Sequence, residues 1–330
     1  MPISVISSLS FWARNAAIEQ FLSARSEVGE QPLLLTIDLL DSQEDGELSL
    51  RITRQAPAST ASSTISWEGN CASYATLALL SDYFDHSLEE REIIVVLPVG
   101  VSLKTCISAA EQAQVPVKNA LLALDPSTLE DDLWDSGMMS SRVSSGGCDD
   151  ERTPGEFLVG EVGWADTAVL AEIPLTHSTA AERERAEELL EHIGPHLALL
   201  RGEATSCGCF ERQLAFQRSQ AGYLPTEPLA DGKNFRTVVL TSQKPISQEK
   251  LAEALPRMVE GACRVRGTVQ LEEFPGEEIA VEGIGPAVWL ASQGETKRPL
   301  TTTIAITGDD LDPQELQELF DSCQTTDQPA

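Results

Sequence analysis

Apolar and polar positions along the chain predict strands and helices that alternate. The longest apolar run, REIIVVLPVG (91–100), is typical of a strand buried on both faces of a parallel sheet. Other strands are expected at 3–7, 32–40, 48–54 and 115–125, and helices near 16–22, 71–84, 102–114 and 181–194. The helix at 102–114 begins with a capping serine, Ser102. This alternation over 1–205 predicts a doubly wound α/β domain with a mostly parallel sheet.

Three stretches interrupt this pattern. Residues 56–64 (APASTASST) are all small and predict a loop, and residues 126–156 are polar and rich in Gly and Ser, which predicts a flexible surface insertion. Residues 210–232 contain Tyr223, Pro225 and Gly232 and predict a connector. We therefore expect an α/β domain at 1–209, a connector at 210–232 and a second domain at 233–330.

The pattern changes beyond the connector. Strands are expected at 235–247, 263–274, 277–292 and 301–308, and helices at 248–262 and 312–323. This order predicts a small α+β domain, with one sheet and helices on one of its faces.

Charge narrows the classes of partner. Lys and Arg number 23 and Asp and Glu number 52, a net charge of −29 at pH 7, and neither part of the chain is basic. This charge disfavours direct contact with nucleic acid or an anionic membrane, and it favours a basic protein partner. The seven scattered cysteines indicate a reducing, cytoplasmic setting, and we expect neither a signal peptide nor a membrane span.

The last third of the chain carries three motifs: an Arg-x-Arg-Gly strand, a Gly-x-Gly hairpin and a Gly-x-Asp-Leu-Asp turn before the final helix. Their residues are Arg264, Arg266, Gly267, Gly283, Gly285, Gly308, Asp310, Leu311 and Asp312. This part resembles the C-terminal domain of the CobW family of metal-related P-loop GTPases. The resemblance implies that the first domain has a P-loop GTPase-like fold, with its nucleotide chemistry degenerate.

A P-loop needs glycine amides to wrap phosphates, a lysine to balance their charge and a Ser or Thr for Mg²⁺. After the first strand this chain reads SLSFWARNAAIEQ (8–20), without Gly or Lys, and Phe11 and Trp12 would crowd the phosphates. An ordinary strand-to-helix turn is therefore favoured over an altered anion loop.

The resemblance also locates the positions that read guanine. Ala171, Glu172 and Pro174 stand where the family has Asn, Lys and Asp, and they cannot make the hydrogen bonds by which the family's Asn and Asp bind the guanine edge. GTP and Mg²⁺ are therefore not expected as cofactors. The family also has an Asp near Asp125, for which we expect a capping or turn role here.

Candidate metal ligands are few. Cys71 is retained from the family's metal motif, but Ser73 and Tyr74 replace the other two thiols. Cys207 and Cys209 form the other candidate, and His192, His196 and Cys148 are the nearest further ligands in sequence. Zinc binding stays open as a weak site, while a structural role is favoured for all three candidate cysteines, because a tight zinc site takes four ligands.

Two functions follow. The favoured one is a non-catalytic adaptor, a pseudo-GTPase linked to zinc homeostasis. The layout resembles a branch of the family that lacks the P-loop and recruits a ribosome-hibernation factor under zinc limitation, which implies a basic, ribosome-associated partner. The alternative is a GTP-binding zinc metallochaperone with a noncanonical nucleotide site.

Overall fold

The structure is a computed structural model that describes residues 2–27, 31–40, 47–56, 59–69, 71–86, 91–142, 150–171, 173, 178–200, 207–225, 232–285, 287–295 and 301–325. It divides into two compact units. The N-terminal unit comprises Met1–Leu129, Gly137–Glu187 and His196–Ala215; the C-terminal unit comprises Glu130–Ser136, Glu188–Pro195 and Phe216–Ala330. Two segments from within 1–209 thus belong to the C-terminal unit.

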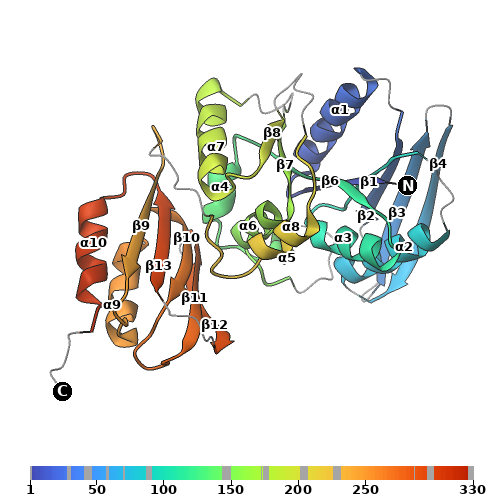
Figure 1. Ribbon diagram of the computed structural model, residues 1–330. Coiled ribbons are helices and arrows are strands. Elements are labelled where there is room, and N and C mark those ends of the chain that lie inside the picture. The colour runs from blue at the N-terminus through green and yellow to red at the C-terminus, as the bar shows by residue number, and fades with distance from the viewer. Residues whose placement is uncertain are drawn as a thin grey trace. The chain divides into compact units, whose positions relative to one another are not determined.

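A mostly parallel sheet forms the centre of the N-terminal unit (Figure 1). Its described strands are β1 (Ile3–Ser8), β2 (Leu33–Leu40), β3 (Glu47–Ala56), β4 (Ser59–Glu68), β5 (Ile93–Val96), β6 (Val117–Leu124), β7 (Thr167–Leu170) and β8 (Ala198–Leu200). They lie in the order β4-β3-β2-β5-β1-β6-β7-β8. Neighbours from β2 to β8 run parallel, whereas β3 is antiparallel to both β2 and β4.

Strand β1 lies where the strand order reverses. The chain places β2 and β5 on one side of β1 and β6, β7 and β8 on the other. In open α/β sheets, ligands bind outside the carboxyl ends of the strands at such a switch point. The carboxyl end of β1 is therefore the first place to look for a functional site.

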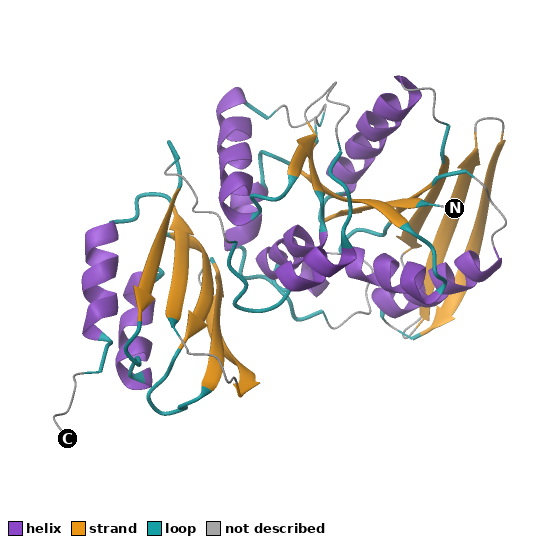
Figure 2. Ribbon diagram, in the orientation of Figure 1, coloured by secondary structure: helices purple, strands orange, loops and turns teal. Residues whose placement is uncertain are grey.

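Helices cover both faces of this sheet (Figure 2). Helix α1 packs on one face against a core that includes Ile6, Val96 and Leu121, while α3 and α6 contact β6 from the opposite face. The described helices of the chain are α1 (Phe11–Glu27), α2 (Ala72–His86), α3 (Leu103–Gln112), α4 (Leu129–Trp134), α5 (Met139–Arg142), α6 (Pro154–Trp164), α7 (Ala180–Ile193), α8 (Arg212–Arg218), α9 (Gln248–Met258) and α10 (Pro313–Ser322). Among these described helices, no apolar stretch reaches the length of a membrane span.

The loop expected at 56–64 is wrong for the residues described there, because Ala56 ends β3 and residues 59–64 belong to β4; residues 57 and 58 lie outside the described residues. The residues of β4 pair with β3 along the whole length of the two strands, from Ala56 opposite Ser59 to Glu47 opposite Glu68. The pairing with β3 imposes an extended backbone on a segment whose small side chains do not favour one, because strand formation depends on tertiary context.

The flexible insertion expected at 126–156 is wrong for the residues described there. Helices α4 and α5 and the start of α6 occupy it, and Leu129, Leu133 and Met139 are buried. Thr153 and Glu156 form a capping box at the start of α6. The Gly/Ser-rich residues 143–149 lie outside the described residues.

The C-terminal unit contains an antiparallel sheet in the order β12-β11-β10-β13-β9. Its described strands are β9 (Arg236–Ser242), β10 (Ala262–Val269), β11 (Glu277–Ile284), β12 (Ala287–Glu295) and β13 (Thr302–Gly308). Helices α9 and α10 bury Leu251, Met258 and Phe320 against the sheet. The segment 277–292, expected as one strand, forms the antiparallel pair β11 and β12, and Gly285 (φ +51°) follows the end of β11.

These two sheets confirm the predicted fold class, a mostly parallel α/β sheet followed by a small α+β domain. The buried strand at 91–100 is confirmed as β5, and the Ser102 cap is confirmed because its hydroxyl accepts from the backbone N–H of Lys104 at 3.2 Å.

Candidate functional site

The carboxyl end of β1 leads into α1 through a very short turn. β1 ends at Ser8 and α1 begins at Phe11, so Leu9 and Ser10 are the whole connection. The Ser10 hydroxyl accepts from the backbone N–H of Ala13 at 3.2 Å and thereby caps α1. A two-residue turn has no loop of amides that could wrap a phosphate, so the backbone here does not fit the P-loop arrangement.

The hydroxyls at the end of β1 bind neighbouring backbone instead. Ser7 Oγ donates to the carbonyl of Val101 at 2.9 Å, and Ser8 Oγ donates to the carbonyl of Ala123 at 2.8 Å. Both serines are fully buried. These bonds tie β1 to the segment that follows β5 and to the end of β6, and the serine side chains therefore face protein.

Arg14 is the one cation held inside this edge among the described residues, and its side chain is 2% exposed. Its guanidinium donates to the carbonyl of Leu97 at 3.0 Å, just beyond β5, and to Asp38 Oδ1 at 2.6 Å, near the end of β2. The Phe11 ring lies 5.2 Å from the guanidinium carbon. The Arg14 guanidinium is therefore engaged by the protein's own groups: it hydrogen-bonds a backbone carbonyl beyond β5, and the Asp38 carboxylate balances its charge.

A carboxylate of the chain occupies the beginning of α3 at the same edge. Glu161, from α6, accepts from Ser102 Oγ at 2.5 Å and from the backbone N–H of Leu103 at 2.8 Å. Helix N-termini attract anions, and here the anion is internal. Burial raises the pKa of Glu161, although the hydrogen bonds from Ser102 and Leu103 oppose that shift.

Asp125 has the turn role expected for it. Its Oδ1 accepts from the backbone N–H of Ser127 at 2.9 Å and from Ser127 Oγ at 2.6 Å. This is an Asx turn at the end of β6. Of the positions compared with the family's guanine-reading residues, Ala171 is buried and donates its N–H to the carbonyl of Leu124, while Glu172 and Pro174 lie outside the described residues.

The three candidate cysteine ligands lie in different surroundings. Cys71 is half-buried just before α2, Cys207 is half-buried against the core below α1, and Cys209 is exposed. Burial raises the pKa of the Cys207 thiol, which disfavours the thiolate that a metal needs. Across the described ranges, no three His, Cys, Asp or Glu side chains gather closely enough to hold a metal ion.

The two histidines near the cysteine pair are engaged elsewhere. His192 Nδ1 lies 2.9 Å from Thr237 Oγ1 within the C-terminal unit, and His196 Nε2 lies 3.0 Å from the carbonyl of Val162 within the N-terminal unit. Cys148 lies outside the described residues.

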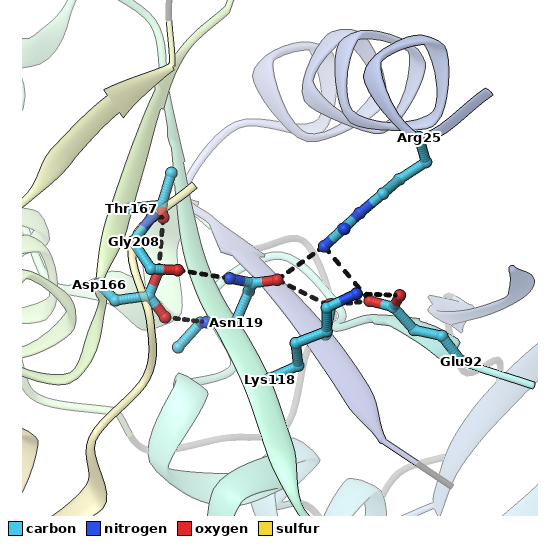
Figure 3. Close-up of polar contacts among 9 residues, drawn as sticks. Arg25, Glu92, Lys118, Asn119, Asp166, Thr167 and Gly208 are labelled. Carbon is cyan, nitrogen blue, oxygen red and sulfur yellow. Dashed lines mark hydrogen bonds and ion pairs between the residues drawn. The ribbon is translucent and has the colours of Figure 1, made fainter. Parts of the chain in front are cut away.

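The segment that carries Cys207 and Cys209 is held by a buried polar network at the amino ends of the strands (Figure 3). Asn119 Nδ2 donates to the carbonyl of Gly208 at 2.6 Å, and the Gly208 N–H donates to Thr167 Oγ1 at 3.0 Å. A Cβ at Gly208 would lie 2.5 Å from the carbonyl oxygen of Asp166, so only glycine fits this approach. The packing of Gly208 against these residues therefore accounts for the glycine between Cys207 and Cys209.

The same network continues to charged residues. Arg25, at the end of α1, donates to Asn119 Oδ1 at 2.8 Å and points toward Glu92, as Figure 3 shows. Lys118 Nζ donates to Glu92 Oε2 at 2.9 Å. This network lies at the opposite edge of the sheet from the switch-point site.

In the C-terminal unit, the motif residues also have structural partners. Arg264 and Arg266 both bind Glu282, and the backbone N–H of Gly222 donates to the same carboxylate at 2.6 Å. Burial lowers the pKa of Arg264 to about 10. Gly267 (φ +154°) lies so close to β13 that a Cβ would fall 2.0 Å from the carbonyl oxygen of Thr303.

Sequence reasoning missed the roles of Arg14, Asp38 and Glu161. A signal for two of them was present, because Asp38 interrupts the apolar run PLLLTIDLL and Glu161 interrupts FLVGEVGW. A single acid inside a buried apolar segment indicates a paired or hydrogen-bonded carboxylate.

Comparison with known families matches residues 235–324 to the cobalamin synthesis protein cobW C-terminal domain, which confirms the resemblance seen in that part of the sequence. No curated protein matches the chain. Two solved structures are similar over 98% of this chain, each with a TM-score of 0.40. One is a Zn(II)-bound triple mutant of the YjiA GTPase, 12% identical and covered over 100% of its length; the other is Zn(II)-bound YjiA GTPase from E. coli, 11% identical and covered over 99%.

Proposed function

We propose that this protein is a non-catalytic, CobW-like adaptor linked to zinc homeostasis, which recruits a basic, ribosome-associated protein such as a hibernation factor. One observation carries the proposal. A nucleotide would bind at the switch point of the sheet. There the chain's own Arg14 hydrogen-bonds the carbonyl of Leu97, beyond β5, and Glu161 accepts from the first amide of α3. A fold whose ligand position is filled by its own side chains serves as a shaped surface, because fold and activity are separable.

Charge supports the choice of partner. A net charge of −29 gives a negative potential that speeds encounter with a positively charged protein. Salt screens such attraction over about 8 Å at physiological ionic strength, so the association rate depends on salt. The kind of partner, a ribosome-associated hibernation factor, rests on the resemblance of the layout to that branch of the family.

The experiment has two stages. The full chain, tagged and expressed in zinc-starved cells, is used to capture partners, and the captured basic protein is then purified. Its association rate with the full chain is measured from low to high salt. We expect the rate to fall by about tenfold or more. An acidic protein of similar size is the control and should not associate at any salt concentration.

Two outcomes would overturn the proposal. Absence of any captured ribosome-associated protein would remove the adaptor role, and an association rate that stays flat with salt would remove the electrostatic argument. Micromolar affinity for GTP together with GTP turnover would instead support the zinc metallochaperone GTPase.

A further inference from the structure

Strand β4 is an exposed edge of the large sheet. In the part of the chain that the structure describes, β4 pairs with β3 on one side and ends the sheet on the other. Every residue of Ser59–Glu68 except Trp67 is exposed. A row of backbone N–H and C=O groups on the outer side of β4 is therefore available to a further strand.

This edge lacks the devices that normally block strand addition. Ser59–Glu68 contains no Pro or Gly, and no charged residue occurs between Arg54 and Glu68. The other sheet edges differ, since β8 has three residues, β9 begins with Arg236, and β12 ends in Gly294 and Glu295. Short length, glycine and charge all weaken edge-to-edge pairing, so β4 is the edge most open to it.

Charge decides which occupant fits. The hairpin of β3 and β4 carries Glu47, Arg51, Arg54 and Glu68, which sum to zero, in a chain whose net charge is −29. A basic partner would find no acidic side chain between Arg54 and Glu68. Two copies of this acidic chain would repel least where they meet through the uncharged residues 59–67 of β4.

We infer that β4 is the interface for a second copy of this chain, through antiparallel pairing of the two β4 strands about a two-fold axis. Such an axis keeps both sheets facing the same way and pairs residues of equal side-chain face. With the axis at Ser63, Ala61 lies opposite Ile65 of the second copy and Ser59 lies opposite Trp67 of the second copy. No charged side chain opposes another within Ser59–Trp67.

The apolar side chains of β4 support this pairing. The register with β3 puts Ile65 opposite Leu50 and Trp67 opposite Leu48, both of which are buried. Ile65 itself is 43% exposed. In the register with the axis at Ser63, Ala61 of the second copy would lie beside Ile65 and cover part of its exposed surface, which contributes to the stability of cross-strand pairs.

The test is the solution mass of the full chain, measured by light scattering and by sedimentation over a range of concentrations. We expect a species of twice 35.7 kDa at high concentration. Ser63→Lys places two like charges at the axis and should raise the dimer dissociation constant by about tenfold or more. Ser63→Val at the same position is uncharged and should leave the dimer intact.

A matched variant tests whether the site is β4. Ser292→Lys puts the same charge on the exposed edge strand β12 and should leave the dimer unchanged. The inference is overturned if the unmodified chain is monomeric at all concentrations, if Ser63→Lys dimerises like the unmodified chain, or if Ser292→Lys is the variant that dissociates.

Hydrogen exchange of the unmodified chain gives an answer that does not depend on any variant folding. Amides of Ser59–Trp67 that face away from β3 should exchange more slowly at high than at low protein concentration. Equal exchange rates in that strand, in a sample shown to be dimeric, would place the interface elsewhere.

Discussion

Each unit buries an arginine against a carboxylate, but the two carboxylates differ in how far they are buried and in which other partners they have. In the C-terminal unit, Arg264 and Glu282 are both 7% exposed, and Glu282 also binds Arg266 and the Gly222 N–H. In the N-terminal unit, Arg14 is buried while Asp38 is 17% exposed and has a second partner, Arg51, at 3.1 Å.

The difference shows what each motif is for. The family-like arginines and glycines of the C-terminal unit hold one strand against the next, so the fold itself needs them. At the carboxyl edge of the N-terminal unit, Arg14 binds the carbonyl of Leu97 and Glu161 binds the first amide of α3. These side chains occupy the place where a ligand would otherwise bind.

Gly267→Val should prevent stable folding of the C-terminal unit. The added Cβ would meet the backbone of Thr303 at 2.0 Å, and neither strand can move without losing its pairing. We expect a loss of about 4 kcal/mol or more in the free energy of unfolding, measured by calorimetry. Gly160→Ala is the control in the N-terminal unit, where a Cβ has nothing within 4 Å, and it should stabilise by about 0.5–1 kcal/mol.

Glu282→Gln should destabilise the C-terminal unit by about 3–5 kcal/mol, because it leaves Arg264 buried without a counter-charge. Chemical denaturation monitored by tryptophan fluorescence measures this loss. A change below about 1 kcal/mol, the value for an exposed pair, would show that the buried pair does not support the fold.

The position at which a C-terminal fragment begins should change its thermal stability. A fragment of residues 233–330 lacks the Gly222 N–H that binds Glu282 and the carbonyls of Arg218 and Gln220 that bind Arg266. We expect a cooperative thermal transition for 233–330, with a higher midpoint for 216–330. If both fragments melt at the same temperature, the contacts of residues 216–223 do not contribute to stability.

Arg14→Met should lower the free energy of unfolding by about 1–3 kcal/mol, less than Glu282→Gln. In this variant Asp38 is still partly exposed to solvent and still contacts Arg51. The same denaturation experiment compares the two variants directly. An equal or larger loss for Arg14→Met would contradict the contrast between the two pairs.

Glu161→Gln should change the pH dependence of stability. Because the folded protein raises the pKa of Glu161, the folded state holds its proton more tightly than the unfolded state, and stability falls as pH rises from about 4.3. The variant cannot titrate there, so its free energy of unfolding relative to the unmodified chain should rise with pH above that value. A constant difference across pH would contradict the shift.

Sequence patterns predicted the elements whose side chains carry the signal themselves. The β-branched run at 91–100 gave β5, and Ser102 marked the start of α3. The Arg-x-Arg-Gly motif marked Gly267, which the structure places against the backbone of Thr303.

The patterns failed where partners distant in sequence decide the structure. The strand β4 exists because β3 lies beside it, and the small residues Ser59, Thr60 and Ala61 do not indicate this. The contacts of Arg14 with Leu97 and Asp38 likewise join residues 83 and 24 positions apart, which no local pattern can show.

The protein's own side chains, Arg14 and Glu161, fill the carboxyl edge of the sheet at β1. Isothermal titration of the full chain with GTP and Mg²⁺ shows whether a nucleotide can still bind there. We predict no binding heat up to about 1 mM GTP, where any affinity would be weaker than about −4.1 kcal/mol. A micromolar dissociation constant, with GTP turnover in the same sample, would show instead that this edge holds a nucleotide.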